Sequence, residues 1–472
     1  MSIAIDPMPT PGPAPTRTAS HRGRAAARAV APPPEKAPAS KAVRYGFVAL
    51  TIGLVLSDRF AVSVSSLPLG ATLPLVYILL AVLLLNRRLA IDPVALLLYV
   101  GATTVAFMSY VLNTTALGGS PASIASMALL LVIYLPFAFT MKAEASNPAE
   151  WRWAMRLLSN VLIVSAICGI VQFYAQFVIH EPWLFDASTL IPDVIRGQGI
   201  YNSAIKLGSF YKSNGFFTRE PSGFSYLMAF GLLLELALFK RVRRMVLYVL
   251  ALALSYSGTG LLVLAIGLLL PLRVKTMLSL LIGGAVIVIG NAAAGDPLNL
   301  SLTYARIGEF STRGSSAYIR YVAPMQMIDY NIDASPWSMW VGHGPGMIFR
   351  MPAPSEFHDP TWAKLVIEYG LLGFIVFLAL FIYKLSSFDA PFQLRVVLFA
   401  SWLVTGGQLL APENVYFMFL VLGLWPRQPR QARQSEVSGG AQAGPRDDLP
   451  GAVPPSSLSP SPSPAPRMAR PA

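Results

Sequence analysis

The chain has 472 residues, of which 54% are hydrophobic and only 12% are charged, and its formal net charge is +13. Soluble domains carry about 25% charged residues, so this composition excludes an ordinary soluble enzyme. The positive charge lies mostly in the two ends of the chain and in short segments between apolar runs, which does not favour nucleic-acid binding. The apolar runs can cross ~30 Å of hydrocarbon. They predict an all-α, polytopic integral membrane protein, because a helix satisfies its backbone polar groups internally.

Both ends of the chain differ in composition from its middle. Residues 1–43 are rich in Pro, Ala and basic residues, and they lack the early apolar stretch of a cleaved signal peptide. Residues 426–472 are rich in Pro and Ser. Such segments have too few apolar groups to offset the entropy that is lost on ordering. We therefore expect disordered cytoplasmic tails on either side of a polytopic membrane domain at 44–425.

Apolar segments between the tails predict twelve membrane spans. Basic residues mark the cytoplasmic ends of spans, and every basic cluster falls on one side if both termini are cytoplasmic. The clusters are Arg87-Arg88, Lys142 with Arg152 and Arg156, Lys240 to Arg244, Arg273 with Lys275, Lys384 with Arg395, and Arg427 to Arg433. The expected spans lie near 44–66, 69–85, 90–112, 121–141, 155–178, 223–239, 245–257, 258–272, 276–292, 361–383, 394–410 and 413–425.

The segment 245–272 decides the orientation of everything that follows it. It is too short for two ordinary spans, and the polar turn 255–260 lies in its middle. We expect two short helices that meet at this turn. A single long helix is the competing interpretation, but it would put the basic cluster at Arg273 and Lys275 on the wrong side. With two helices, the long loops 179–222 and 293–360 both lie outside the cytoplasm, on one face.

The first long loop ends with three ionisable residues at the mouth of a span: Lys212, Arg219 and Glu220. Phe216 and Phe217 beside them could form an interfacial anchor, because aromatic and basic side chains favour the headgroup level. Glu220 precedes a Pro-Ser pair and an apolar run, so it could cap the first turn of that helix. The segment is therefore either a membrane anchor or part of a site.

The second long loop carries three arginines spaced by seven residues: Arg306, Arg313 and Arg320. A helix would bring them to one face, since two turns take ~7 residues, but intervening glycines argue against one continuous helix. Arg320 lies in a semi-apolar segment, where a charge needs a partner. It either pairs with Asp329 or Asp333, or binds a phosphate, onto which a guanidinium forks through two hydrogen bonds.

The end of the second loop combines a glycine-rich turn with a histidine. Gly342, Gly344 and Gly346 lack the lysine and the preceding strand of a phosphate-binding loop, so we expect a tight structural turn. His358 follows, just before the apolar run 365–383. It is the best candidate for a general base, because imidazole titrates near neutral pH.

The sequence offers neither a disulfide nor a metal site. Its one cysteine, Cys168, lies in an apolar run and has no second cysteine as a partner. The four histidines and the acidic residues show no metal-ligand spacing. We therefore expect no metal and no cofactor.

Taken in order, these motifs resemble the O-antigen ligase/polymerase superfamily, membrane enzymes that join polyprenyl-diphosphate-linked glycans. The resemblance covers most of 44–425, and members have twelve spans, cytoplasmic termini and two large periplasmic loops. Arg320 lies where the family has an arginine, and Gly342, Gly344 and Gly346 match its Gly-x-Gly-x-Gly turn. The other matching segments are Lys212-Ser213-Asn214-Gly215-Phe216-Phe217 with Glu220-Pro221, and His358-Asp359 followed by Leu365, Glu368 and Gly370-Leu371-Leu372-Gly373.

Three features depart from the family pattern. Lys212 stands where arginine is usual, which keeps the charge but loses the planar fork. Asp359 replaces the common asparagine, and the turn 255–258 lacks the arginine of the family's Ser-x-Ser-Arg element. The missing arginine and the Glu-Pro-Ser element are more typical of exopolysaccharide polymerases than of ligases onto a lipid acceptor.

The resemblance implies a glycosyltransferase of the bacterial inner membrane that transfers lipid-linked repeat units on the periplasmic side. It would be inverting and metal-independent, and it would need no nucleotide, because its leaving group is already activated. Negative charge grows on the departing diphosphate, and preorganised cations stabilise it. Arg320 is the first choice for this role, with Lys212, Arg219 and Arg313 in support.

The same resemblance leaves the proton transfer open. His358 would either deprotonate the acceptor hydroxyl or bind the diphosphate, and Glu220 would serve as a second base or orient a cation. A flippase and a chain-length regulator are the expected protein partners.

Two other functions compete with a polymerase. One is an O-antigen ligase, and the other, from a different class, is a flippase or transporter of lipid-linked oligosaccharides. A transporter is expected to place paired ionisable residues inside its spans. Glu235 is the clearest such residue, and its position before Lys240 allows it to pair at the cytoplasmic end of its helix.

Overall fold

The computed structural model describes residues 40–64, 67–116, 121–144, 146–196, 203–269, 310–332, 337–351, 358–404 and 409–426, with positions 278, 282, 285–286, 289–295, 308 and 356. These residues belong to one compact unit, 38–472. Most of the two predicted tails, and most of the predicted span 276–292, lie outside the described residues.

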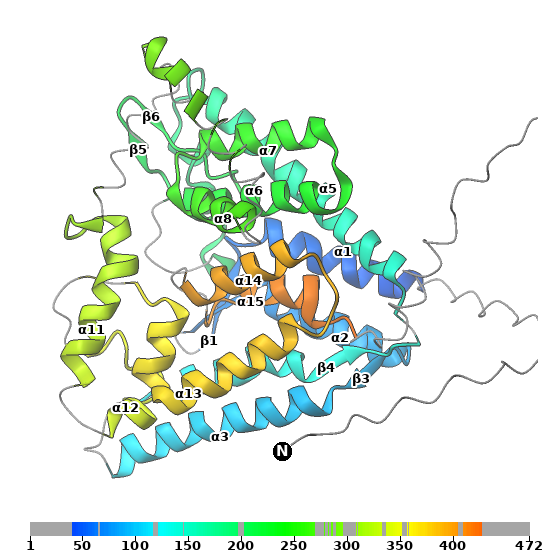
Figure 1. Cartoon of the computed structure of the whole chain (residues 1–472), viewed down its shortest axis with the longest axis vertical. Coiled ribbons are helices and arrows are strands. Elements are labelled where there is room, and N and C mark those ends of the chain that lie inside the picture. Colours follow the sequence, from blue (N-terminus) through cyan, green and yellow to red (C-terminus); the bar gives the residue numbers. More distant parts are fainter. Residues whose placement is uncertain are drawn as a thin grey trace, which may run out of the picture. The chain divides into compact units, whose positions relative to one another are not determined.

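The described residues are mostly helical, as expected from the composition (Figure 1). The helices are α1 (Lys41–Leu56), α2 (Thr72–Leu85), α3 (Pro93–Thr115), α4 (Ile124–Tyr134), α5 (Pro148–Ala175), α6 (Pro221–Leu234), α7 (Val242–Leu254), α8 (Gly258–Leu269), α11 (Ala323–Ile332), α12 (Ser338–Val341), α13 (Thr361–Leu385), α14 (Phe392–Val404) and α15 (Pro412–Met418). Wider π-type turns are η5 (Glu235–Phe239), η7 (Tyr318–Val322) and η8 (Phe419–Gly423).

Short antiparallel strand pairs lie among the helices. β1 (Ala61–Val64) pairs with β2 (Leu67–Gly70), β3 (Leu89–Ile91) with β4 (Phe139–Met141), and β5 (Lys206–Leu207) with β6 (Phe210–Tyr211). The first predicted span, 44–66, is therefore too long. α1 ends at Leu56, and the charged pair Asp58-Arg59 and a strand follow it.

Each of the other eleven predicted spans contains a described helix, and the described positions of 276–292 are helical. Four of these helices are long and apolar enough to cross a membrane by length and composition: Pro93–Thr115, Pro148–Ala175, Pro221–Phe239 and Thr361–Leu385. Shorter apolar helices include Thr72–Leu85 and Gly258–Leu269. Twelve spans and their orientation stay a prediction.

The polar turn 255–257 separates α7 from α8, as the two-helix interpretation predicted. The Ser255 hydroxyl donates to the Leu252 carbonyl at 2.6 Å, and Tyr256 has φ of 43°. This left-handed residue ends the first helix. The alternative of one continuous helix is wrong.

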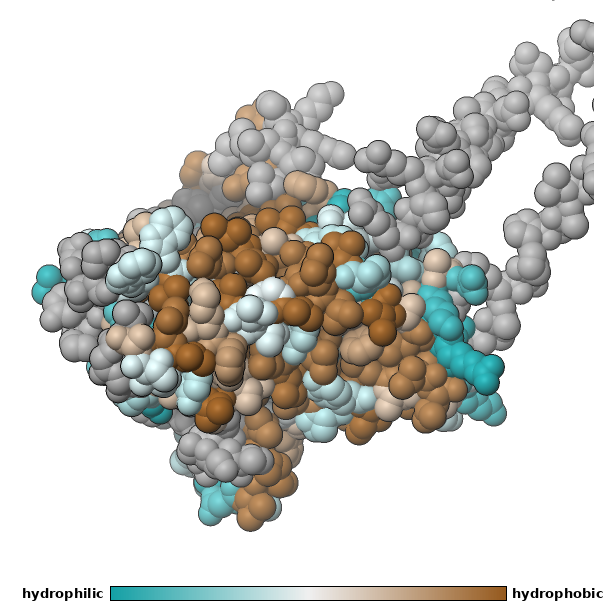
Figure 2. All heavy atoms as spheres, turned by 90° about the horizontal axis from the view of Figure 1, so that it is seen from below, coloured by the Kyte–Doolittle hydropathy of each residue, from teal (hydrophilic) through white to brown (hydrophobic). Residues whose placement is uncertain are grey.

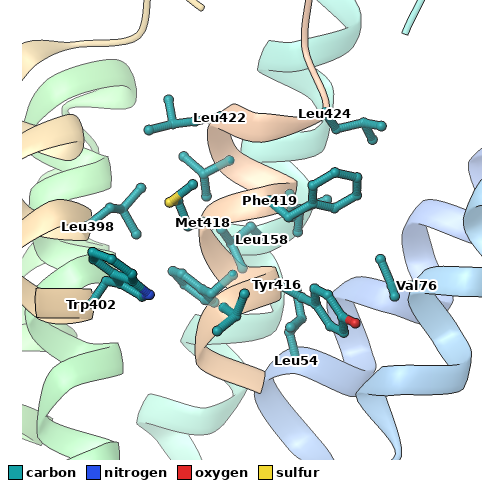
Figure 3. Packing of buried hydrophobic residues seen from close by; sticks show 14 of the residues in the cluster. Leu54, Val76, Leu158, Leu398, Trp402, Tyr416, Met418, Phe419, Leu422 and Leu424 are labelled. Atoms are coloured by element: carbon teal, nitrogen blue, oxygen red, sulfur yellow. The ribbon is translucent and has the colours of Figure 1, made fainter. Parts of the chain in front are cut away.

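The last helical segment, α15 with η8, is surrounded by other helices. Figure 3 shows its side chains Tyr416, Met418 and Phe419 among residues of α1, α2, α5 and α14, and all of them are buried. Trp402 of α14 stacks on Phe381 at 3.8 Å between ring centroids. A helix that is apolar on all sides is typical of a buried position, and this one forms the centre of the bundle.

Apolar residues also cover much of the outside. Leu85, Leu97 and Val100 are exposed, and Figure 2 shows that apolar residues dominate the described part of one face. A soluble protein rarely leaves such a large apolar surface open. The surface therefore fits a lipid environment.

Ion pairs join the helices at one end of the bundle. Arg88 lies 2.6 Å from Glu150, and Lys384, at the end of α13, lies 3.1 Å from Asp92, which caps α3. The other end of α13 begins at Thr361, beyond an interruption of the helix at Gly370. At that end the structure places its polar cavity.

Candidate functional site

A cavity of about 370 Å³ lies where α6, α8, α13 and α15 begin. Both long loops contribute to it, although they are far apart in the sequence. Its apolar lining residues include Leu54, Leu227 and Phe417. Its acidic and basic lining residues are Asp58, Arg219, Glu220, Arg320, His358, Asp359 and Glu413. Four of the residues predicted for the site therefore meet in one place.

Arg320 projects from the turn η7 and has two partners at the cavity. Its Nη2 lies 3.6 Å from Glu220 Oε2, and its Nη1 donates to Thr259 Oγ1 at 3.2 Å. Thr259 belongs to the first turn of α8, so the polar turn between α7 and α8 contributes to the site. Of the two aspartates predicted as structural partners, Asp333 lies outside the described residues. The ion pair with Glu220 joins the two long loops.

Glu220 occupies the N-cap position of α6, as the sequence predicted, but its carboxylate does not cap the helix. It accepts a hydrogen bond from the Ser222 hydroxyl at 2.9 Å and faces Arg320. Pro221 at the first helical position sets the start of α6. The helix start therefore aims this carboxylate at the cavity.

His358 is tied to the same turn as Arg320. Its backbone N–H donates to the Ile319 carbonyl at 2.8 Å, one residue before Arg320. Burial lowers the pKa of His358, and the positive charge of Arg320 lowers it further, while Glu220 and Asp359 oppose the shift. The imidazole is therefore neutral at pH 7, with a lone pair that can take a proton.

Arg219 is held by Asp58, which follows α1. Asp58 accepts the backbone N–H of Arg219 at 2.9 Å, and its second oxygen lies 3.5 Å from Arg219 Nε. Glu413, at the start of α15, lines the cavity near them. The sequence analysis missed both acids because they lie in segments assigned to spans. A charged residue inside an apolar segment is itself a signal of function.

Arg59, which the sequence analysis also missed, fixes the first loop beside the cavity. It is buried, donates to the carbonyls of Phe216 and Phe185 at 2.8 and 3.0 Å, and pairs with Asp186 at 3.2 Å. It also donates to the hydroxyls of Ser188 and Ser203 at 2.8 and 3.3 Å, so the guanidinium has five partners. This residue therefore supports the shape of the loop.

Lys212 and Arg313, the other predicted phosphate ligands, do not line the cavity. Lys212 is buried, and its backbone donates to the Ile205 carbonyl at 3.0 Å. Its neighbour Asn214 donates to the Phe185 carbonyl at 2.7 Å, so this segment supports the loop from inside. Arg313 is exposed on a turn, and Arg306 lies outside the described residues.

The glycine-rich turn packs against α13 behind the cavity. Gly342, Gly344 and Gly346 all have positive φ (74°, 98° and 74°), which agrees with the predicted tight turn. The Gly344 N–H donates to the Glu368 carbonyl at 3.0 Å, where α13 is interrupted by Gly370 with φ of 66°. A Cβ on Gly342 would lie 2.4 Å from the Glu368 backbone, so the two segments interlock.

A buried ion network connects this turn to the cavity. Lys364 Nζ lies 2.9 Å from Asp359 Oδ2 and 3.6 Å from Glu368 Oε1. Glu368 Oε1 also accepts the Ile348 N–H at 3.4 Å. The network therefore runs from the interrupted helix to Asp359, the neighbour of His358.

A comparison with protein families identifies one match that covers most of the chain. The family model described as WcaD colanic acid polymerase matches residues 47–424. No curated protein shows significant similarity to the chain.

Proposed function

Since the chain belongs to the WcaD colanic acid polymerase family, we propose that it extends a polysaccharide by joining repeat units carried on polyprenyl diphosphate. It is a membrane-embedded polysaccharide polymerase. The observation that carries it is the cavity that unites Arg320, Glu220, His358 and Arg219 from two distant loops.

Arg320 and Arg219 are the cations for the leaving diphosphate. In the transfer, an acceptor hydroxyl attacks the anomeric carbon, the bond from that carbon to the diphosphate oxygen breaks, and the electron pair leaves with the diphosphate. A guanidinium forks onto phosphate oxygens, and a preorganised cation stabilises the developing charge. Glu220 holds Arg320 in place through the 3.6 Å ion pair, so we assign it the orienting role.

His358 is the base that takes the proton of the acceptor hydroxyl. Its lowered pKa keeps the imidazole neutral at pH 7, which favours proton transfer over binding of the diphosphate as a cation. A single displacement of this kind inverts the anomeric centre.

The arrangement of the helices supports a periplasmic site. The cavity takes residues from both predicted periplasmic loops, 179–222 and 293–360. The ion pairs Arg88–Glu150 and Lys384–Asp92 lie at the opposite ends of the helices, where the basic clusters predict the cytoplasm.

Deletion and complementation test the proposal in the native membrane. Cells that lack the gene are expected to lose the polymer and accumulate single lipid-linked repeat units, and the wild-type gene restores the polymer. Arg320→Ala is expected to fail at equal protein level, whereas Arg313→Ala, in the same loop but outside the cavity lining, restores it. Loss of polymer without accumulation of lipid-linked units would point away from a polymerase.

A further inference from the structure

A second cavity of about 570 Å³ adjoins the charged one, and its lining is apolar instead of charged. Its described lining is apolar apart from one tyrosine, and it includes Val62 of β1, Leu73 and Tyr77 of α2, and Val132 of α4. The Tyr77 hydroxyl is satisfied, because it donates to the Val132 carbonyl at 2.7 Å. We call this cavity the apolar groove.

The apolar groove starts at the charged cavity and follows α2 away from it. Gly70 lines both cavities. The lining residues on α2 and just before it then run from Ala71 through Leu73 to Tyr77, a distance of about 9 Å at 1.5 Å per residue. The groove therefore descends from the ends of the helices toward the middle of the bundle.

The apolar side chains along the groove lack cover from the protein. Phe60, Val62, Val132 and Ile195 are 38%, 49%, 40% and 39% exposed. In a membrane such side chains contact hydrocarbon, and an apolar chain that fits the groove gains van der Waals contacts with them. The groove is therefore shaped and lined for a hydrocarbon chain.

We propose that the apolar groove binds the first isoprene units of the donor's polyprenyl chain while its diphosphate lies between Arg219 and Arg320. The inference rests on the proposed function and deepens it. A chain that is covalently attached to a diphosphate in the charged cavity must leave through an apolar exit, and Gly70 marks such an exit. The continuity of the two cavities selects the lipid carrier over the acyl chains of bulk phospholipids.

Gly70 keeps the exit between the two cavities open. A Cβ at this position would lie 3.3 Å from Glu413 Oε2 and 3.7 Å from Thr72 Oγ1. A larger side chain at this position would therefore project into the junction.

The test compares two donors that carry the same oligosaccharide diphosphate, one on the natural long polyprenol and one on a methyl group, which is too small to enter the groove. Val62→Trp and Val132→Trp fill the groove, and Ile78→Trp, on an exposed position of α2 outside the groove, is the control. We expect each groove variant to raise KM for the long-chain donor about tenfold, the scale of about ten lost van der Waals contacts between heavy atoms. The KM for the methyl donor, and both KM values of the Ile78→Trp control, are expected to change little.

Three results would overturn the inference. The groove variants could match wild type with both donors, or they could impair both donors equally. A photoreactive side chain at Val62 could label a bulk phospholipid probe that excess long-chain donor fails to displace. If the wild-type protein uses neither donor, the proposed function fails instead, so the two failures are distinguishable.

Discussion

Lys364→Met tests the buried ion network that connects α13 with the cavity. The Lys364 side chain is only 5% exposed, and it is shared by Asp359 and Glu368, at 2.9 and 3.6 Å. Methionine has a similar volume, so the substitution removes the charge and leaves little cavity. It leaves two carboxylates near each other without their cation.

Removing one partner of a buried ion pair typically costs about 3–5 kcal/mol, because the remaining charge stays desolvated. We expect Lys364→Met to lower the free energy of unfolding by this amount, as measured by chemical denaturation in detergent micelles. Lys364→Met/Glu368→Gln is expected to recover part of the loss, since the amide carries no charge and still accepts the Ile348 N–H. The exposed Lys41→Met is the control, with a change of about 0.5 kcal/mol or less.

Two outcomes would refute this reasoning. The free energy of unfolding of the single variant could lie within about 1 kcal/mol of the wild-type value, which is the contribution of an exposed ion pair. The double variant could also be less stable than the single variant, which would mean that the charge of Glu368 is not the source of the cost.

Three further predictions concern the chemistry. Arg320→Lys is expected to recover little of the activity that Arg320→Ala loses, because a point charge lacks the fork that binds two phosphate oxygens; polymer yield at matched expression measures this. A base must be neutral to act, so the acid limb of kcat/KM follows the lowered pKa of His358 and lies below pH 6.5. The negative charge of Asp359 raises the pKa of His358, so Asp359→Asn should move the acid limb to lower pH. An acid limb that does not move would show that the pH dependence does not come from His358. Purified protein should also couple lipid-linked units in chelator, and activity that returns only with magnesium would contradict a cation role carried by arginines alone.

The sequence predicted the central side chains of the site better than their surroundings. Short motifs in two loops predicted the site residues Arg320, Glu220, His358 and Arg219. The predicted topology put those two loops on the same face. The fold adds the 3.6 Å contact between Arg320 and Glu220. Such a pairing across about a hundred residues has no local signal, because it depends on how the helices pack.

The missed and misplaced residues have a common cause. Asp58 and Glu413 lie inside segments whose average hydropathy marks a span, so their charges were averaged away. Lys212 looked like a ligand because of its charge and position, whereas the fold buries it beside the supporting network of Asn214 and Gln172. The sequence shows that a residue is charged, but only the packed structure shows whether its side chain lines the cavity.

The interlocking of the glycine turn with α13 shows the same limit. Local sequence predicted a turn at Gly342, and an apolar helix over 361–383. It did not predict that Gly370 interrupts the helix so that the Glu368 carbonyl accepts the Gly344 N–H. Close approach of two backbones requires glycine on both sides, and only the packed structure identifies the partner.

The most direct test of the central claim is a polymerisation assay with purified protein and lipid-linked repeat units, in which products are separated by length. We predict a ladder of products for wild type and for Arg313→Ala, and only single units for Arg320→Ala, with all three proteins equally folded. A full ladder from Arg320→Ala would show that the cavity described here is not where the glycan is transferred.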